Sequence, residues 1–185
     1  GKEYIEWKVL AKEDNRMLLI SDKALDCKQY NTSLIRVTWE DCTLREWLNE
    51  TFWNDAFNAE EQAQIQSTTV LADRNPEYST DPGNATTDKV FLFSITEVKE
   101  YFDSDEARRC APTAYAIAQG AGVSDDYKTV DGAPTGWWWL RSPGSHEIVN
   151  DAADVDVDGS VDSEGDVVDY DGGCVRPAIW VSLDA

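Results

Sequence analysis

The sequence predicts an α+β protein built as one domain over residues 1–185. A chain of 185 residues is long enough for one well-buried core and short for two. Hydrophobic residues make up 42% of the chain and include eight Trp, which excludes a disordered polypeptide. Short β-prone segments are interspersed with helix-start motifs, so we expect short helices packed on antiparallel sheets.

The first elements are two strands and a helix. Residues 5–10 (IEWKVL) and 17–21 (MLLIS) are short, apolar and β-prone. The polar stretch 12–16 between them predicts a hairpin turn. Residues 43–46 (TLRE) have the S/T-x-x-E form of a capping box, and apolar side chains follow at helical spacing. This pattern predicts a helix over 44–53.

A second helix, a loop and a buried strand follow. Residues 58–61 (NAEE) form another helix start, and Ile65 closes its short apolar stripe. Residues 71–88 are rich in Asn, Pro, Ser, Thr, Asp and Gly without periodicity, which predicts a surface loop. The apolar run 89–94 (KVFLFS) then predicts a buried strand.

Two further helices are expected before the carboxy-terminal part of the chain. Residues 94–97 (SITE) form a third capping box, followed by apolar residues at helical spacing. Pro112 is well placed in the first turn of another helix, because the missing N–H of proline is tolerated there. Gly120 or Gly122 would end that helix.

Charge and composition exclude several classes of function. The formal net charge is −20, so the molecule repels phosphate backbones and anionic lipids; we expect no nucleic-acid partner and no membrane insertion. No apolar run reaches the roughly 18 residues that a spanning helix needs. The single histidine, His146, rules out multi-histidine metal sites. Zinc spacing is absent among the scattered cysteines, which we expect to be free thiols: Cys27, Cys42, Cys110 and Cys174.

The segment from Ser145 to Cys174 differs in composition from the rest of the chain. It contains no Lys, Arg, Gln, Met or Trp. Residues 153–158 (ADVDVD) alternate Val with Asp, which is typical of a half-buried strand with Val inward and Asp outward. Gly159 and Gly165 predict turns, and 166–169 predicts a further short strand. We therefore expect an antiparallel sheet that presents acidic and small polar side chains to water.

Two simple interpretations of this acidic segment remain open. One is a solvated strand-and-loop region without a ligand. The other is a calcium site, because Asp154-x-Asp156-x-Asp158-Gly159 reproduces the first half of an EF-hand-type loop. The twelfth position, which should supply a bidentate Glu, is Gly165, and an extended strand would not wrap its carboxylates around an ion.

A third interpretation comes from the residue vocabulary of the segment. Its Asn, Asp, His, Tyr, Ser, Gly, Cys, Ile, Val and Ala residues are all reachable from the codon AAC by changing only its two adenines. Glu147 and Glu164 are the exceptions. The composition is therefore consistent with diversification directed at adenines.

The motifs that flank the segment carry a family resemblance. Residues 138–144 (WWLRSPG) and 175–181 (VRPAIWV) resemble the signature of C-type-lectin-fold variable proteins of diversity-generating retroelements, which are similar to the formylglycine-generating-enzyme branch of that fold. Residues 39–49 (WEDCTLREWLN) and 88–94 (DKVFLFS) agree with it. The resemblance implies a C-type-lectin-like fold, with residues 145–174 as a variable ligand-binding region, in a longer surface or phage protein.

The resemblance also implies a set of ligand-binding residues within the segment. The rewritten side chains would bind a macromolecular ligand, most simply a protein, and we expect the domain itself to be a monomer without a cofactor. Tyr170 and His146 combine an apolar body with a polar tip, so we expect them to be the energetic anchors. The implied positions are His146, Ile148, Asn150, Asp151, Asp154, Asp156, Asp158, Ser160, Asp162, Ser163, Asp166, Asp169, Tyr170 and Asp171.

Enzymatic activity is not expected, since no two cysteines match an oxidase motif and no carboxylate pair stands out. The alternative function is that of a calcium-stabilised structural or adhesion domain. Of the three residues 137–139 (WWW), one or two should line the base of the site, because successive strand residues face opposite sides. Arg141 and Arg176 should hold buried carboxylates or carbonyls.

Overall fold

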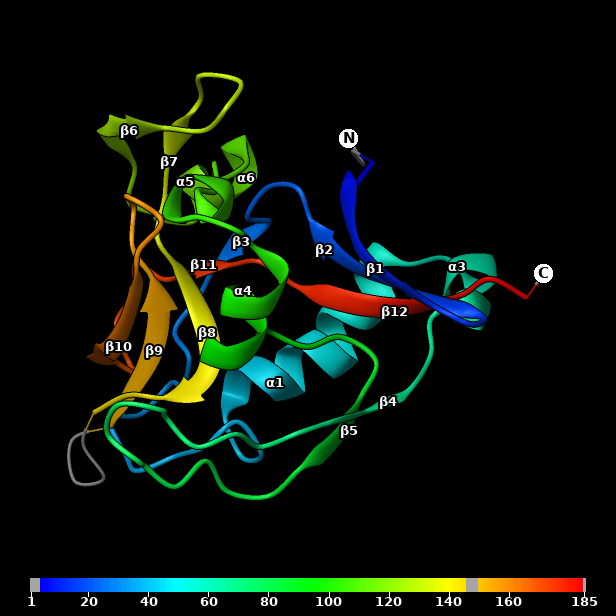
Figure 1. Cartoon of the computed structure of the whole chain (residues 1–185), viewed down its shortest axis with the longest axis horizontal. Coiled ribbons are helices and arrows are strands. Elements are labelled where there is room, and N and C mark those ends of the chain that lie inside the picture. The colour runs from blue at the N-terminus through cyan, green and yellow to red at the C-terminus, as the bar shows by residue number, and fades with distance from the viewer. Residues whose placement is uncertain (1–3, 146–149, 185) are drawn as a thin grey trace.

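The computed structural model describes residues 4–145 and 150–184, which form an α+β fold with mostly antiparallel sheets and short helices (Figure 1). Among these residues no helix is long and apolar enough to cross a membrane. In chain order the elements are β1 (Trp7–Glu13), β2 (Arg16–Ser21), β3 (Asp26–Cys27), α1 (Thr43–Trp47), η1 (Leu48–Phe52), α2 (Trp53–Ala56), α3 (Ala59–Gln64), β4 (Thr68–Val70), β5 (Thr86–Asp88), α4 (Ile95–Tyr101), α5 (Asp105–Arg108), α6 (Ala114–Ala118), β6 (Ser124–Lys128), β7 (Pro134–Thr135), β8 (Trp138–Pro143), β9 (Asp151–Val155), β10 (Val161–Val167), β11 (Cys174–Val175) and β12 (Ala178–Ser182).

One sheet joins the two ends of the described chain in the order β1-β2-β12. The predicted amino-terminal hairpin is confirmed, with a tighter turn at Asp14 and Asn15 than the polar stretch suggested. β12 pairs antiparallel with β2 and places Trp180 opposite Leu18. Figure 1 shows this sheet on the side of the molecule away from β9 and β10.

The other large sheet carries the compositionally distinct segment, in the order β10-β9-β8-β11-β3. All its adjacent strands are antiparallel except β8 and β11. β8 is buried along its whole length and turns Trp138 and Trp139 to opposite faces. Trp138 packs near the Arg176 guanidinium, whereas Trp139 packs edge-on against Tyr30, so both faces of β8 are covered.

The helix starts follow the sequence prediction with one correction. Asn58 and Ser94 cap α3 and α4 through complete capping boxes, as expected. The first helix does not begin with a box at Thr43. Its N-cap is Cys42, whose Sγ accepts from the backbone N–H of Arg45, while the Thr43 hydroxyl accepts from the backbone of Thr32. Helical structure then continues through η1 and α2 to Ala56, beyond the predicted end.

The helix expected near Pro112 is confirmed as α6. Thr113 is its N-cap, so Pro112 lies just before the helix and not within its first turn. Gly120 follows the C-cap residue with φ of 113°, a left-handed conformation that favours glycine. Gly120, and not Gly122, therefore ends the helix.

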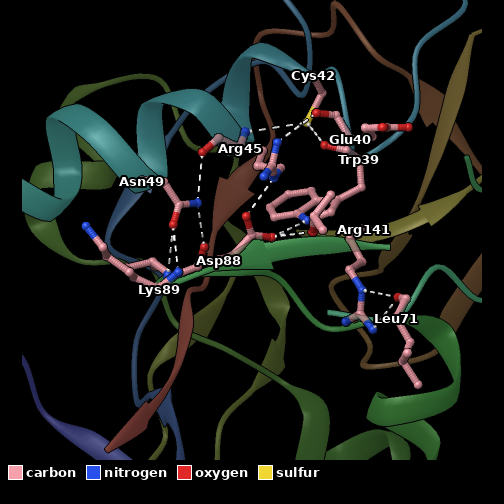
Figure 2. A network of polar contacts seen from close by, with 11 residues as sticks. Trp39, Glu40, Cys42, Arg45, Asn49, Leu71, Asp88, Lys89 and Arg141 are labelled. Carbon is pink, nitrogen blue, oxygen red and sulfur yellow. Dashed lines mark hydrogen bonds and ion pairs between the residues drawn. The ribbon is translucent and has the colours of Figure 1, made fainter. Parts of the chain in front are cut away.

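The predicted loop 71–88 and strand 89–94 need correction. The end of the loop forms β5, which pairs with β4. Residues 90–93 are buried, as expected, but make only an isolated bridge through Phe91 and Ala178. Instead of a ladder, the Asn49 carboxamide accepts from the backbone of Lys89 and Val90 and donates to the Val90 carbonyl (Figure 2).

Asp88 is the centre of a buried polar network beside this segment (Figure 2). It is 1% exposed, pairs with the Arg45 guanidinium at 2.7 Å and accepts from the indole N–H of Trp39 at 2.9 Å. A buried carboxylate is tolerated when it is paired and hydrogen-bonded in this way. The network fixes helix α1 on the extended segment 89–94.

Both arginines of the flanking motifs have the structural role that we expected. Arg141 pairs with Glu97 and donates to the carbonyls of Leu71 and Leu92. Arg176 is fully buried and donates to the carbonyls of Ser21 and Arg108. Neither guanidinium is available to a ligand.

Candidate functional site

The sequence-predicted site residues divide by exposure. His146 and Ile148 lie outside the described residues. Those whose side chains face solvent are Asp156, Asp162, Tyr170 and Asp171. Those that are half-buried are Asn150, Asp151, Asp158, Ser160, Asp166 and Asp169. Asp154 and Ser163 are buried.

The alternation of Val and Asp predicts the structure only in part. β9 ends at Val155, which is fully buried and faces the core as expected. Val157 is half-buried in the turn that follows, so it is not a strand residue. Asp154 was expected at the surface and is only 6% exposed. β9 is flanked by β8 and β10, and the successive residues Ala153, Asp154 and Val155 are all buried, so both of its faces are covered at this position.

Asp154 lies among other carboxylates. It is the register partner of Asp162 on β10 and of Trp139 on β8. Asp166 pairs with Ala152, two residues before Asp154, and therefore shares the same sheet face. Burial first, and then the charges of Asp162, Asp156 and Asp166, raise the pKa of Asp154 to about 8. At neutral pH this side chain is mostly a neutral carboxylic acid.

The turn between β9 and β10 is stabilised by its own side chains and by helix α5. The Asp158 carboxylate accepts from the backbone N–H and the hydroxyl of Ser160, which lowers the pKa of Asp158. Arg108 and Arg109 donate to the carbonyls of Gly159 and Asp158. Gly159 has φ of 89°, and a Cβ there would overlap the Asp105 carbonyl. Glycine is therefore required at this contact.

This turn does not have the geometry of a calcium loop. Asp158 is committed to Ser160, and the Asp156 carboxylate accepts from the N–H of Val157. Asp154 is buried in the sheet. Within residues 4–145 and 150–184, no three acidic, His or Cys side chains are placed together so that they could hold a metal ion.

β10 includes both the turn that was predicted at Gly165 and the start of the strand that was predicted after it. We expected a turn at Gly165 and a separate strand at 166–169, but Gly165 lies inside β10 at a register shift between Asp162 and Asp166. Its φ is 78°, and a Cβ would overlap the Ala152 carbonyl of the neighbouring strand. Gly165 thus forms a bulge that continues the pairing. Ser163 is buried, and its hydroxyl donates to Glu77 at 2.9 Å, so this buried polar group has a partner.

After β10 the chain crosses to the segment 27–31, which holds it by its backbone. Four residues of this segment bind carbonyl groups of the crossing chain, and the side chains of the crossing chain take no part in these contacts. The pairs are Asn31 N–H with Val168 O at 2.8 Å, Gln29 Nε2 with Asp169 O at 2.6 Å, Lys28 N–H with Gly173 O at 2.8 Å, and Cys27 Sγ with Asp171 O at 3.1 Å.

The aromatic residues beside this crossing join the surface to the core. Tyr170 is 48% exposed and packs against Trp137, with ring centroids 5.8 Å apart. Trp137 is half-buried and packs edge-on against the fully buried Trp139 at 4.7 Å. Of the triplet, Trp137 lies against Tyr170, whereas Trp138 and Trp139 are buried in the core. A Cβ at Gly173 would overlap the Trp139 indole, so glycine is required there.

The loop 71–85, predicted as a plain surface loop, holds the other end of the segment. Asn75 is 1% exposed, and its Nδ2 donates to the carbonyls of Pro143 at 2.9 Å and Ser163 at 2.7 Å. The Thr80 hydroxyl donates to the Gly144 carbonyl at 2.7 Å. Polar composition alone does not distinguish such anchoring residues from solvated ones, so no sequence pattern identifies them.

A pocket of about 660 Å³ adjoins Asp171. Its wall includes residues that the sequence reasoning missed, among them Lys28, Thr43 and Trp47. The Lys28 ammonium lies 4.5 Å from the centroid of the Trp47 ring. This wall belongs to the scaffold outside the compositionally distinct segment, and Asp171 is the member of the segment that borders it.

The four cysteines are free thiols, as predicted, and all four are buried. Cys27 and Cys174 are register partners on β3 and β11. Burial raises the pKa of Cys42 to about 12 and holds that of Cys174 far above its usual range, so neither thiol is a nucleophile at neutral pH.

The fold and this surface define an α+β protein whose acidic antiparallel sheet faces solvent at one edge. The family described as "Domain of unknown function (DUF6273)" matches residues 14–183, and the chain belongs to that family. Comparison with curated proteins and with solved structures finds no match.

Proposed function

We propose that the chain is a ligand-binding display domain with a C-type-lectin-like fold, in which residues 145–174 are diversified to bind varied targets. The proposal rests on the resemblance of the flanking motifs to variable proteins of diversity-generating retroelements. The α+β architecture, with short helices on antiparallel sheets, is compatible with it. We propose no catalytic role and no cofactor.

The observation that carries the proposal is that the acidic segment is held through its backbone carbonyl groups, while some of its side chains remain exposed. Asn75 and the segment 27–31 hold the acidic segment through its carbonyl groups, and Thr80 holds the carbonyl of Gly144 just before it. Tyr170 and Asp171 are exposed in the middle of these contacts. Because every residue has a backbone carbonyl, such anchors tolerate changes of side chain. A diversified surface needs this property.

The chemistry of the surface favours a protein ligand with basic or hydrogen-bonding groups. Asp156, Asp162 and Asp171 are exposed carboxylates and would attract cationic side chains. Tyr170, backed by Trp137, supplies an aromatic anchor of the kind that dominates protein interfaces. We propose that the domain binds as a monomer.

A randomised library tests this proposal. Asp156, Asp162, Tyr170 and Asp171 are varied together, and buried positions of the same strands, Ala152, Ala153, Val155 and Ser163, are varied in a matched control library. We expect most members of the first library to melt cooperatively and to yield binders against a panel of purified proteins. The control library should lose the fold. Loss of folding in the first library, or no binder from it, would overturn the proposal.

A further inference from the structure

The pocket of about 660 Å³ beside Asp171 joins the acidic segment to the scaffold. Its volume lies within the range of roughly 300 to 1,000 Å³ that is typical of ligand pockets. The scaffold supplies most of its wall, including Lys28, Thr43, Trp47 and Gln119, whereas Asp171 belongs to residues 145–174. A ligand in this pocket would therefore contact scaffold side chains and a side chain of the proposed diversified segment together.

Lys28 brings a positive charge to the wall of this pocket. Its ammonium lies 4.5 Å from the centroid of the Trp47 ring, and this cation–π contact holds the side chain in place. Its ion pair with Asp26 spans 3.8 Å, which is longer than a hydrogen bond. The Lys28 side chain is 35% exposed. The ammonium can therefore donate hydrogen bonds to an anionic group that enters the pocket.

Asp171 brings the opposite charge to the same pocket. Its side chain is exposed and takes part in none of the ion pairs among residues 4–145 and 150–184. Its backbone is held by the pocket wall, because Cys27 Sγ donates to the Asp171 carbonyl at 3.1 Å. Every residue has such a carbonyl, so a different residue at 171 would change the charge of the pocket and keep this anchor.

The two charges together favour a ligand group that carries both signs. No ion pair of the described chain joins Lys28 to Asp171, so each charge is open to a ligand. A lone carboxylate would be attracted by Lys28 but repelled by the net charge of −20. A lone ammonium would be attracted by Asp171 but repelled by Lys28. Adjacent acidic and basic side chains, with no net charge, avoid both penalties and match both residues.

We propose that this pocket takes an acidic side chain of the protein ligand at Lys28 and Trp47, and that residue 171 selects the ligand side chain next to it, which for Asp171 is a basic one. The inference rests on the proposed ligand-binding function and deepens it, because it names a scaffold subsite and a selecting position. Lys28 offers the same contact to the carboxylate of every ligand. The residue at 171 then decides which neighbour of that carboxylate is accepted.

Titration with dipeptides blocked at both ends tests this subsite. The protein is labelled with ¹⁵N, and the indole N–H signal of Trp47, assigned with Trp47→Phe, reports binding by NMR. We expect the Glu-Lys dipeptide to shift this signal at millimolar concentration. The Glu-Gln and Gln-Lys dipeptides should each bind about threefold to fivefold more weakly, which is the range for one partly exposed ion pair. Equal affinity of the three dipeptides would overturn the inference.

Three variants separate the subsite from general attraction to an acidic protein. Lys28→Gln should lower the affinity for Glu-Lys about fivefold and leave that for Gln-Lys no weaker. Lys89→Gln is the matched control, because the Lys89 ammonium also lies 4.5 Å from a tryptophan ring centroid, that of Trp53, and it should bind as the wild type. Asp171→Lys should reverse the selection, so that Glu-Glu binds more tightly than Glu-Lys. Equal losses for Lys28→Gln and Lys89→Gln, or unchanged selection in Asp171→Lys, would contradict the proposal.

Failure of the inference is distinguishable from failure of the proposed function. The dipeptide titrations report only on the pocket beside Asp171, whereas the randomised library reports on the tolerance of the whole surface. A library that folds and yields binders, together with wild-type dipeptide binding by Lys28→Gln, would overturn the inference alone. Dipeptide selection that depends on Lys28 and on residue 171, together with a library that does not fold, would leave the subsite in place and overturn the display function.

Discussion

Asp154 and Asp162 lie directly opposite each other on β9 and β10, with the first buried and the second exposed. Like charges in a cross-strand pair destabilise a sheet. Burial and the neighbouring charges raise the pKa of Asp154 to about 8, and a protonated Asp154 does not repel its partner at neutral pH. The strongly perturbed carboxyl group of Asp154 thus lies inside the sheet.

The stability of the protein should depend on pH through Asp154. The unfolded chain loses this proton near pH 4, and the folded protein keeps it until about pH 8, so the unfolded state binds fewer protons between these values. The contribution of Asp154 is complete below pH 4 and falls by up to about 1.4 kcal/mol per pH unit as the pH rises toward 8. Urea unfolding of wild type and Asp154→Asn at pH 5 to 8 checks this. The free energy difference between them should shift in favour of the variant with rising pH, and a constant difference would contradict it.

Tyr170 should matter little for folding, although it is the largest exposed side chain of the segment. Its ring contacts Trp137 and leaves the core untouched, so Tyr170→Ala should cost no more than about 1 kcal/mol. Gly173→Ala, three residues on, is the contrasting variant, since its Cβ would overlap the buried Trp139 indole. It should cost about 2 kcal/mol or more. Thermal melts of both variants compare the two losses, and a similar loss for both would argue against a separate surface.

Asn75 should be among the most sensitive polar positions. Asn75→Ala leaves the carbonyls of Pro143 and Ser163 without donors in a buried setting, and each costs about 1–3 kcal/mol. The exposed Asn54, which donates only to Glu50 of its own helix, is the matched control. Hydrogen exchange should show faster opening of β10 and of residues 143–145 in Asn75→Ala. Unchanged protection there would mean that the loop does not hold the segment.

Calcium should have no measurable effect on stability. The Asp158 carboxylate already accepts hydrogen bonds from Ser160, and Asp154 holds a proton at neutral pH, so two of the three alternating carboxyl groups are not free to bind a hard cation. The melting temperature is measured with EDTA and then with added calcium. A fall of several degrees in EDTA that calcium reverses would restore the calcium-stabilised alternative.

The sequence predicted the starts and ends of helices well where a single residue type determines them. The capping residues Asn58 and Ser94 and the helix-ending Gly120 behave as their side chains dictate. The strand at 89–94 was wrong because Asn49, distant in sequence, satisfies its backbone. The residue pattern within 89–94 does not indicate that Asn49 will bind its backbone.

The acidic surface was predicted in composition but only partly in geometry. The alternation of Val and Asp predicted the burial of Val155 correctly and the exposure of Asp154 wrongly. It assumes a strand with one face in solvent, whereas the chain that follows β10 returns across the sheet. The crossing is held by Gln29 and Asn31, whose roles depend on tertiary contact. Sequence reasoning finds which residues are unusual, and the fold decides which of them reach solvent.

The most direct test of a diversified surface is the sequence of the DNA around the coding region. The account predicts a nearby near-copy of the codons for residues 138–180 that differs from them only at adenines, with the differences falling at codons such as those for Asp156, Asp162 and Tyr170. Differences at other bases, or a complete locus without such a copy, would contradict it.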